Sequence, residues 1–550
     1  MNTYIRSSVK SLIGFSVAAA LATSAHAALT FTIPAPNGVG DVVALTNAFQ
    51  QLDAAGFNGR MGARVWLEPG VYDLSGVYME SVSHLLLSNC HNVLVAGLGN
   101  GPGDTILLGG GEAEARRVLN CGGSNYDWLT ISNLTVTGGW TTGNGGGIQG
   151  SGSVRYIDLV VSNNYAKGAW GAGGGGILRG RAINCLFADN RTDNWGGGFF
   201  CDGGGGQDAK FVQGSWNCVF TNNTAASYGG GQFGAGKCIG GTFIDNRAVH
   251  GGAFACNSGA AFTWHGGRFT NETEITGCIF SGNHHTQWGH GTAIHNLSAN
   301  SRPLISVANC VITANIDDHG GNGVVNGCEM TDCTFTGNTR PSCLIYNCNL
   351  TRCLVAENTR TSSGDTFDNN SPAGAYTNVN CLYIRNVDSA YGNLTIGKVL
   401  VNCTYAENIN KGGGNYGGFI RNCPSWNCLF AGNTIGGIRR DIRYQYNGFT
   451  SDLALTNCVI TATYDDVSET FPGLANCRIT KQIKVADEAN SNYAPTTGSP
   501  LYDKAAQDAW ILSLVGDRDL AGNRRVFGEG LDIGAFECQA YPPALKIIVR

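Results

Sequence analysis

A short segment with apolar residues at alternate positions recurs along most of the chain. In the copy that begins at Asn184 and reads NCLFADN, Cys185 and Phe187 are apolar and Asp189 is polar. This period of two residues predicts a half-buried strand. Further copies begin at Asn217, Gly240, Gly277, Asn309, Asp332, Arg352, Asn380, Asn402 and Asn427, and weaker copies begin at Asn457 and Asn476.

The cysteine of this segment sets the repeat length. It lies at positions 185, 218, 278, 310, 333, 353, 381, 403, 428, 458 and 477, with Gly241 in the same place, so successive copies are 19 to 37 residues apart. Unequal spacing around an unchanged segment is typical of a solenoid whose loops differ in length. The repeat lacks a helical period and is too short for a propeller blade. We therefore predict an all-β fold, a right-handed parallel β-helix solenoid with one coil per repeat.

Parallel coils place equivalent residues directly over one another, which predicts ladders of identical side chains. The cysteines form one ladder of small apolar core residues. An asparagine five residues after the cysteine position forms a second ladder, in which we expect hydrogen bonds from amide to amide and left-handed backbone at the turn. Its members are Asn190, Asn223, Asn246, Asn283, Asn315, Asn338, Asn358, Asn386, Asn408 and Asn433.

The chain has 21 cysteines in all. We expect those of the ladder to stay mostly thiols, because parallel strands hold their side chains side by side rather than facing one another. An exported protein can oxidise the others. We expect one to three disulfides outside the ladder, among residues that include Cys201, Cys238, Cys256, Cys328, Cys343, Cys348 and Cys423.

The two ends of the chain depart from the repeat. Residues 1–27 read as a secretory signal peptide, with basic Arg6 and Lys10, an apolar run and a small-residue cleavage site at Ala27. Residues 28–61 are predicted as an N-terminal cap with one helix over 41–56, in which Asp41 caps the start and Gly56 the end. The repeats span 62–484, and 485–550 form a C-terminal cap segment.

Three segments carry a family resemblance. The predicted helix followed by ARVWLEPGVYDL resembles the start of right-handed, pectate-lyase-like β-helix proteins. F-x-x-N, as in Phe243 to Asn246, paired with G-G-A-F at Gly251 resembles the repeat of polymorphic outer-membrane proteins, and residues 516–537 are similar to the closing segment of many secreted bacterial β-helix proteins. The resemblance implies the pectin-lyase fold and a secreted or cell-surface protein associated with the outer membrane.

Composition narrows the possible partners. The 81 glycines come with only 13 prolines and no three-residue period, which excludes collagen. A net charge of -5 gives no electrostatic reason to expect nucleic acid. After signal cleavage no apolar run is long enough to span a membrane. We expect a monomer that binds a polysaccharide or a cell-surface glycan.

Five ring-bearing residues form the candidate carbohydrate-binding site. Each follows a ladder asparagine by four or five residues and directly precedes a glycine, on five consecutive coils: Trp195, Tyr228, His250, Trp288 and His319. If they face outward, they make a strip of rings about 4.8 Å apart on which sugars can stack. The alternative is that the rings stabilise the solenoid or pack under a loop.

No residue set qualifies as catalytic. Gly289-His290-Gly291 resembles the G-H-G of polygalacturonases, but the acidic pair Asp317-Asp318 follows this triplet, whereas it precedes it in that family. We interpret His290 as a repeat glycine replaced by histidine. The other candidates are interpreted as turn or loop residues: Asp317, Asp318, Asp465, Asp466, Arg439, Arg440, Arg443, Asp517, Asp519 and Asn523.

Two functions remain open from the sequence. The first is an adhesin-like surface or secreted protein that binds glycans along the solenoid. The second is a polysaccharide lyase or glycoside hydrolase acting on acidic polysaccharides, which requires a convergent acid–base cluster. We expect no cofactor for the first function, and calcium only if the protein is a lyase.

Overall fold

The structure is a computed structural model. It describes residues 29–36, 42–55, 62–87, 91–122, 127–168, 173–201, 212–234, 236–256, 263–264, 267–268, 273–297, 304–316, 319, 321–340, 343–361, 368–369, 376–389, 393–411, 419–442, 445–446, 449–450, 454–461, 473–490 and 492–540. The predicted signal peptide, the helix-capping Asp41 and Gly56, and five candidate residues lie outside these residues: Asp317, Asp318, Arg443, Asp465 and Asp466. The domain boundaries stay predictions.

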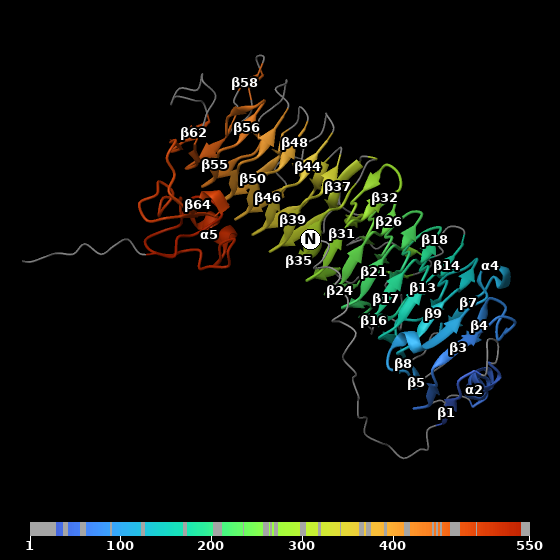
Figure 1. The fold of residues 1–550 in the computed structure, drawn as a ribbon. Helices are drawn as coiled ribbons and strands as arrows, with labels where there is room; N and C mark the ends of the chain where they lie inside the picture. Colours follow the sequence, from blue (N-terminus) through green and yellow to red (C-terminus); the bar gives the residue numbers. More distant parts are fainter. Residues whose placement is uncertain are drawn as a thin grey trace, which may run out of the picture.

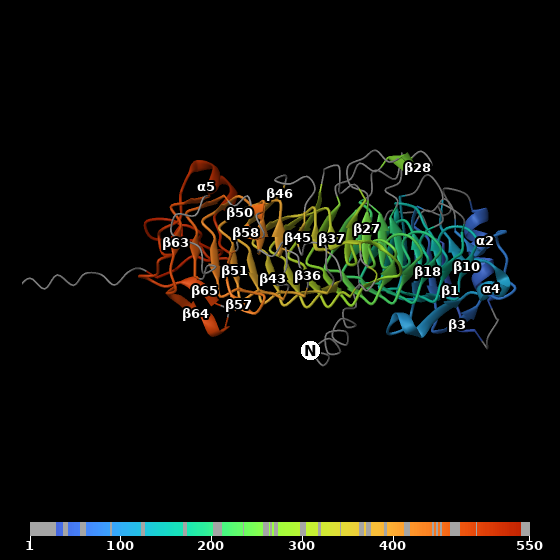
Figure 2. The ribbon, with the colours of Figure 1, turned by 90° about the horizontal axis from the view of Figure 1, so that it is seen from above.

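The chain winds into a parallel β-helix, as the repeat predicts (Figures 1 and 2). Three long sheets of 17, 16 and 14 strands run along an elongated rod. One coil contributes β16 (Arg181–Ile183), β17 (Leu186–Ala188), β18 (Arg191–Thr192) and β19 (Phe199–Cys201). The next coil starts with β20 (Gly214–Trp216), which pairs in parallel with β16. A typical coil therefore adds one strand to each long sheet.

Two tight corners define each coil. The corner between β16 and β17 is made by Asn184, with φ 54°, and the corner between β17 and β18 is made by Asp189, with φ 56°. The left-handed residue thus precedes the ladder asparagine, and the expectation that the ladder asparagine itself takes this conformation was wrong. The reason is geometric, because Asn190 must point inward to reach the next coil.

The asparagine ladder is confirmed. Asn190 Nδ2 donates to Asn223 Oδ1 at 3.0 Å, and the same bond links Asn408 to Asn433 at the far end. The backbone N–H of each member donates to the same oxygen, as from Asn190 to Asn223 at 3.0 Å. Asn164 donates to Asn190 at 3.0 Å and extends the ladder by one coil beyond the prediction.

The twenty cysteines that the structure describes are all free thiols. In the ladder, a backbone N–H approaches the sulfur of the next coil, as from Cys353 to Cys381 at 3.5 Å. The expected disulfides among Cys201, Cys238, Cys256, Cys328, Cys343, Cys348 and Cys423 are wrong. Among them, Cys328 and Cys348 are neighbours on successive coils, and the backbone N–H of Cys328 approaches the sulfur of Cys348 at 3.4 Å.

Stacked aromatic rings fill part of the core, beside aliphatic side chains. Phe187 and Phe220 stack with centroids 4.7 Å apart, and Phe220 and Phe243 follow at 4.6 Å. Later coils place Tyr383 over Tyr405 at 4.6 Å. These rings are fully buried, so the F-x-x-N pattern of the sequence marks the interior of the rod.

The predicted N-terminal helix is α2 (Val43–Ala54), which buries Leu45, Ala48, Phe49 and Leu52 near one end of the rod. At the other end lie β64 (Val485–Asp487), β65 (Asn492–Pro495) and α5 (Ala509–Val515). This C-terminal segment packs its Leu501, Ile511 and Leu531 against the outer faces of the last coils. Among the described residues, none of the helices has the length and apolar character needed to cross a membrane.

Candidate functional site

Three of the five predicted ring residues lie in register on consecutive coils. Trp195 forms a parallel bridge with Tyr228, and Tyr228 forms one with His250. The glycine after each ring has a left-handed φ, 65° at Gly196 and 64° at Gly229. Its N–H donates to the ring residue of the next coil, as from Gly196 to the Tyr228 carbonyl at 2.9 Å. Their role in carbohydrate binding stays a prediction.

The next ring in register is His290 rather than Trp288. The Gly251 N–H donates to the His290 carbonyl at 3.0 Å, and the Gly291 N–H donates to the Asn322 carbonyl at 3.1 Å. The predicted positions of Trp288 and His319 in the column are therefore wrong, as is the interpretation of His290 as a replaced glycine. Two residues inserted after the ladder asparagine shift the register, which a fixed spacing of four or five residues cannot detect.

A second column, which the sequence analysis missed, runs beside the first. It comes from β19, β23 (Gln232–Gly234), β27 (Phe254–Cys256), β34 (Ile294–Asn296) and β37 (Gly321–Asn326) of the 14-stranded sheet. Pairing in register gives Phe200, Phe233, Ala255, His295 and Asn326. Each member is the second residue after a glycine-rich run, so the sequence does hold a signal for this column. It is hard to detect because the residue type at that position changes from coil to coil.

The two columns form one cluster outside the main core, which we call the ring face. It consists of Trp195, Phe200, Tyr228, Phe233, His250, Trp288, His290 and His295. Ala255 has a small side chain, and His295 from the following coil reaches across it. The ring of His295 lies 5.4 Å from that of His250 and 6.5 Å from that of Tyr228. Four consecutive coils thus share one continuous set of rings.

Exposure divides the ring face into two parts. Trp195, Phe200 and Phe233 are 9%, 4% and 6% exposed, so this end is aromatic packing that stabilises the solenoid. Tyr228, His250 and His290 are half-buried, and Trp288 is 63% exposed. Trp288 meets the edge of His290 with centroids 5.1 Å apart at 71°. The rings open to solvent therefore gather around the histidines.

Hydrogen bonds fix the protonation of two imidazoles. His250 Nδ1 accepts from the His290 N–H at 3.1 Å, and His290 Nδ1 accepts from the Asn322 N–H at 3.1 Å. An accepting Nδ1 carries no proton, so in each neutral ring the proton is on Nε2. Burial, with the charges of neighbouring histidines, lowers the pKa of His250 to about 4. Burial also lowers the pKa of His290, and that of His295 lies well below its ordinary value.

Two buried polar atoms of the ring face stand without a partner. His295 Nδ1 and Asn326 Oδ1 are both buried, and neither has a hydrogen-bond partner among the residues that the structure describes. The two residues are directly opposite one another on adjacent strands. Their side chains are 6% and 3% exposed. Buried polar groups are nearly always satisfied, and an enclosed water molecule is the partner that suits two atoms closed off from the surface.

The buried Arg340 holds the coil that carries His290. Its Nη1 donates to Thr292 Oγ1 at 2.7 Å, and its Nη2 donates to the Gly289 carbonyl at 3.2 Å. Arg340 is fully buried, and its charge contributes to the lowered pKa of His290. This guanidinium thus supports the neutral state of the ring face from inside the rod.

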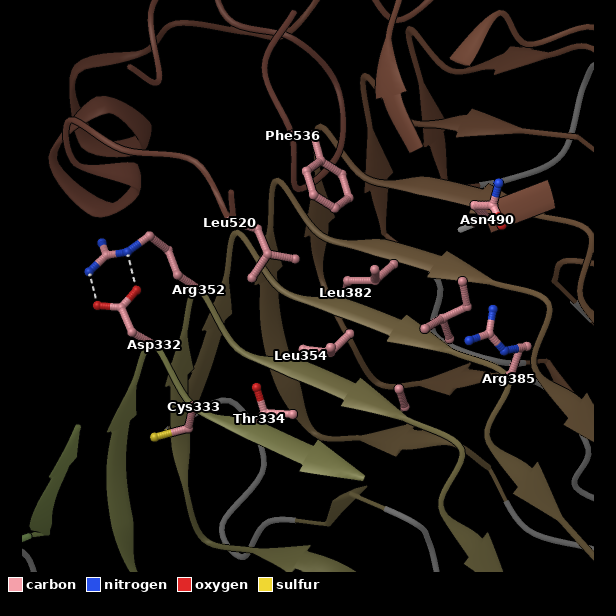
Figure 3. A pocket seen from close by; sticks show the side chains of 12 residues that line it. Asp332, Cys333, Thr334, Arg352, Leu354, Leu382, Arg385, Asn490, Leu520 and Phe536 are labelled. Atoms are coloured by element: carbon pink, nitrogen blue, oxygen red, sulfur yellow. Dashed lines mark hydrogen bonds and ion pairs between the residues drawn. The ribbon is translucent and has the colours of Figure 1, made fainter. Parts of the chain in front are cut away.

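A cavity of about 450 Å³ lies between the C-terminal segment and the 16-stranded sheet (Figure 3). Leu354 and Leu382 line one wall, and Leu520 and Phe536 line the opposite wall. Arg352 at one end is paired with Asp332 at 2.7 Å, and Arg385 at the other end is paired with Glu357 at 2.7 Å. Since both charges are already compensated, the cavity is an apolar crevice beside the docked segment.

The acidic residues of the C-terminal segment serve its own fold. Asp519 accepts from the Asn523 N–H at 2.7 Å and from the Glu537 N–H at 2.9 Å, which confirms a cap turn. Asp503, Asp532 and Glu537 have carboxylate oxygens within 4.8 Å of one another. The buried Arg525 lies 3.6 Å from Glu537 and supplies the positive charge there. Arg439 is exposed, but it lies in the short strand β57 (Ile438–Arg439), opposite Thr434, rather than in the loop that the sequence suggested.

No protein-family model and no curated protein sequence matches the chain. Among solved structures, it is similar to the A-module of the Azotobacter vinelandii mannuronan C-5 epimerase AlgE6, with 15% identity over 77% of this chain and 96% of that one and a TM-score of 0.25. A tailspike protein of Acinetobacter baumannii bacteriophage Fri1, a capsular polysaccharide depolymerase, shares 11% identity over 76% and 66%, with a TM-score of 0.27. PfbA, a surface adhesin of Streptococcus pneumoniae, shares 9% over 74% and 90%, with a TM-score of 0.22.

Proposed function

We propose that this protein binds glycans on its ring face and acts as an adhesin-like protein, secreted or held at the cell surface. The observation that carries the proposal is the exposed ring of Trp288 beside the half-buried rings of His290 and Tyr228. A sugar supplies an apolar C–H face for the rings. Its hydroxyl groups suit the Nε2–H groups of the half-buried His250 and His290.

The electrostatics of the ring face favour an uncharged part of the glycan. The three histidines are neutral near pH 7, because the pKa of each is lowered. The Nε2–H groups of His250 and His290 are donors, and a hydroxyl group both donates and accepts. Recognition of this kind needs no metal and no catalytic acid. It supports binding rather than cleavage as the role of the ring face.

The test replaces the most exposed ring. We expect Trp288→Ala to weaken binding about tenfold for a polysaccharide that the wild-type protein binds, because one stacking contact is lost. Trp510→Ala is the matched control, since Trp510 is 41% exposed on α5 in the C-terminal segment. Binding is measured by affinity electrophoresis against a panel of neutral and acidic polysaccharides.

Two results would overturn the proposal. One is that the wild-type protein is retained by no polysaccharide of the panel. The other is that Trp288→Ala and Trp510→Ala weaken retention equally. Trp195 is a poor choice for this test, because it is 9% exposed and its loss would disturb packing.

A further inference from the structure

Two arginines lie in register on the outer face of the 17-stranded sheet. Arg155, from β12 (Val154–Ile157), and Arg181, from β16, are directly opposite one another on adjacent coils. Parallel strands are about 4.8 Å apart, so the two side chains leave the sheet as neighbours. Two like charges in this arrangement repel each other unless something compensates them.

Tryptophans flank the pair on both sides. The guanidinium of Arg155 lies over the ring of Trp128 at 3.2 Å, and that of Arg181 lies over the ring of Trp216 at 4.1 Å. Gly214 is the residue opposite Arg181 on the next coil, and it leaves room for the side chain to reach Trp216. The order along the rod is therefore tryptophan, arginine, arginine, tryptophan.

Neither guanidinium is neutralised by the described part of the chain. Within those residues, no hydrogen bond or ion pair reaches Arg155 or Arg181, and Arg181 Nε is buried without a partner. Burial, with the charge of Arg181, lowers the pKa of Arg155. Asp158, which follows β12, accepts from Asn184 Nδ2 at 3.2 Å instead. The rings hold both guanidinium groups in place and leave their N–H edges unused.

We propose that Arg155 and Arg181 bind one anionic group, a carboxylate or a sulfate ester, of an acidic polysaccharide. An oxyanion between two guanidinium groups accepts charge-assisted hydrogen bonds from both. The site is separate from the ring face, because it lies on the 17-stranded sheet and recognises charge. It therefore adds a second recognition element to the protein, and it stands whether or not the ring face binds sugar.

The surroundings favour an acidic glycan over nucleic acid. The row of unpaired basic residues does not extend beyond Arg181. Gly214 occupies this register position on the next coil, and Lys237 on the coil after that is paired with Glu274 at 2.7 Å. The whole chain has a net charge of -5. Nucleic acid binding depends on many cations that neutralise many phosphates. A single two-arginine site suits a polymer that presents isolated anionic groups.

The experiment compares the double variant R155Q/R181Q with the wild-type protein. The probes are polygalacturonate, its fully methyl-esterified form and chondroitin sulfate, in binding titrations at low and high salt. We expect the double variant to lose at least about tenfold in affinity for one or both acidic polymers at low salt. We expect its affinity for the methyl ester to be unchanged.

Arg191→Gln is the matched control. Arg191 also lies over a ring, that of Tyr165 at 4.9 Å, but Asp193 is 3.9 Å from its guanidinium. The control variant should keep the wild-type affinity. Folding is checked by the melting temperature, because R155Q/R181Q removes both the like-charge contact and the two ring contacts. Inorganic sulfate should raise the melting temperature of the wild-type protein more than that of the double variant.

Several outcomes would overturn the proposal. They are failure of the wild-type protein to bind either acidic polymer, equal losses in R191Q and R155Q/R181Q, and no greater response of the wild-type protein to sulfate. Binding of duplex DNA that is lost in the double variant, without binding of an acidic polysaccharide, would assign the pair to nucleic acid. If the double variant loses affinity for acidic polymers but binds neutral polysaccharides as the wild-type protein does, the ring-face proposal is unaffected.

Discussion

Asn433 donates both its backbone N–H and its side-chain Nδ2 to one oxygen of Asp441, at 2.9 and 3.1 Å. This carboxylate ends the asparagine ladder. Its other oxygen accepts from the N–H of Thr461 at 3.0 Å and from the hydroxyl of Thr461 at 2.7 Å. Asp441 therefore replaces the amide that a further asparagine would offer, and it ties the last ladder residue to the following coil.

We predict that Asp441→Ala destabilises the C-terminal coils by about 3 kcal/mol, because it leaves four buried donors without acceptors. Asp441→Asn keeps one oxygen and should cost less than half as much. The free energy of unfolding is measured in urea, and hydrogen exchange reports which coils open, since coils of a solenoid can open separately. Equal stability of the alanine variant and the wild-type protein would show that the ladder needs no terminal acceptor.

A second prediction concerns the gap in the cysteine ladder. Gly241 takes the place of a cysteine, and the sulfur of Cys238 fills the space, 3.6 Å from the sulfur of Cys278. A Cβ at Gly241 would lie 3.1 Å from the ring of Phe243 and 3.2 Å from the sulfur of Cys238. We expect Gly241→Cys to destabilise the protein by about 2 kcal/mol through overpacking.

The double variant is the sharper measurement. Cys238→Ala alone removes the filling sulfur, and Gly241→Cys alone adds a second one. In the combined variant the cysteine side chain introduced at position 241 occupies the space that Cys238 vacates. The double variant should therefore lose less stability than the two single variants lose together. Additive losses in chemical unfolding would mean that Cys238 does not stand in for the missing ladder residue.

The ladders were predictable because they rest on one local rule. The alternation at Cys185 and Phe187 and the asparagine at 190 recur with fixed spacing, and parallel pairing turns this recurrence into stacking. Loop lengths follow no such rule. The extra residues before His290 therefore place His290, rather than the predicted Trp288, in register with His250. Arg155 and Arg181 are separated by a whole coil, and only the register of β12 against β16 brings them together.

The third prediction uses the pH dependence of His295. Its pKa lies well below the ordinary 6.5, because the side chain is buried and His250, His290 and His285 are near it. As the pH falls below that ordinary value, the unfolded chain takes up a proton that the folded imidazole does not, so stability falls. Phenylalanine occupies the same register position at Phe200 and Phe233, so His295→Phe should fit.

We expect His295→Phe to melt higher than the wild-type protein, because a buried Nδ1 without a partner is removed. The difference between the two melting temperatures should grow as the pH is lowered from neutral toward about 5. The same variant should bind the ring-face glycan less tightly. A melting difference that is independent of pH would show that His295 does not titrate as its surroundings indicate.

The last prediction concerns the asparagine that precedes the ladder cysteine on the final coils, where it docks the C-terminal segment, as Asn402 and Asn427 do. Asn427 Nδ2 donates to the Ala506 carbonyl at 3.0 Å, and its Oδ1 accepts from the Ala506 N–H at 2.7 Å. The residue also makes a corner with φ 55°. We expect Asn427→Ala to speed proteolysis of the C-terminal segment, since the partly buried N–H and carbonyl of Ala506 lose their partner.

Asn217→Ala separates docking from backbone strain. Asn217 occupies the same corner position with φ 52°, but within the described part of the chain its exposed side chain donates only to Asn184, at 3.4 Å. Both variants lose the asparagine preference for left-handed backbone, so both should lose about 1 kcal/mol from that source. Only Asn427→Ala should release the C-terminal segment in a proteolysis time course, because only this corner is covered by that segment. Equal release from both variants would attribute the effect to the corner rather than to the contact with Ala506.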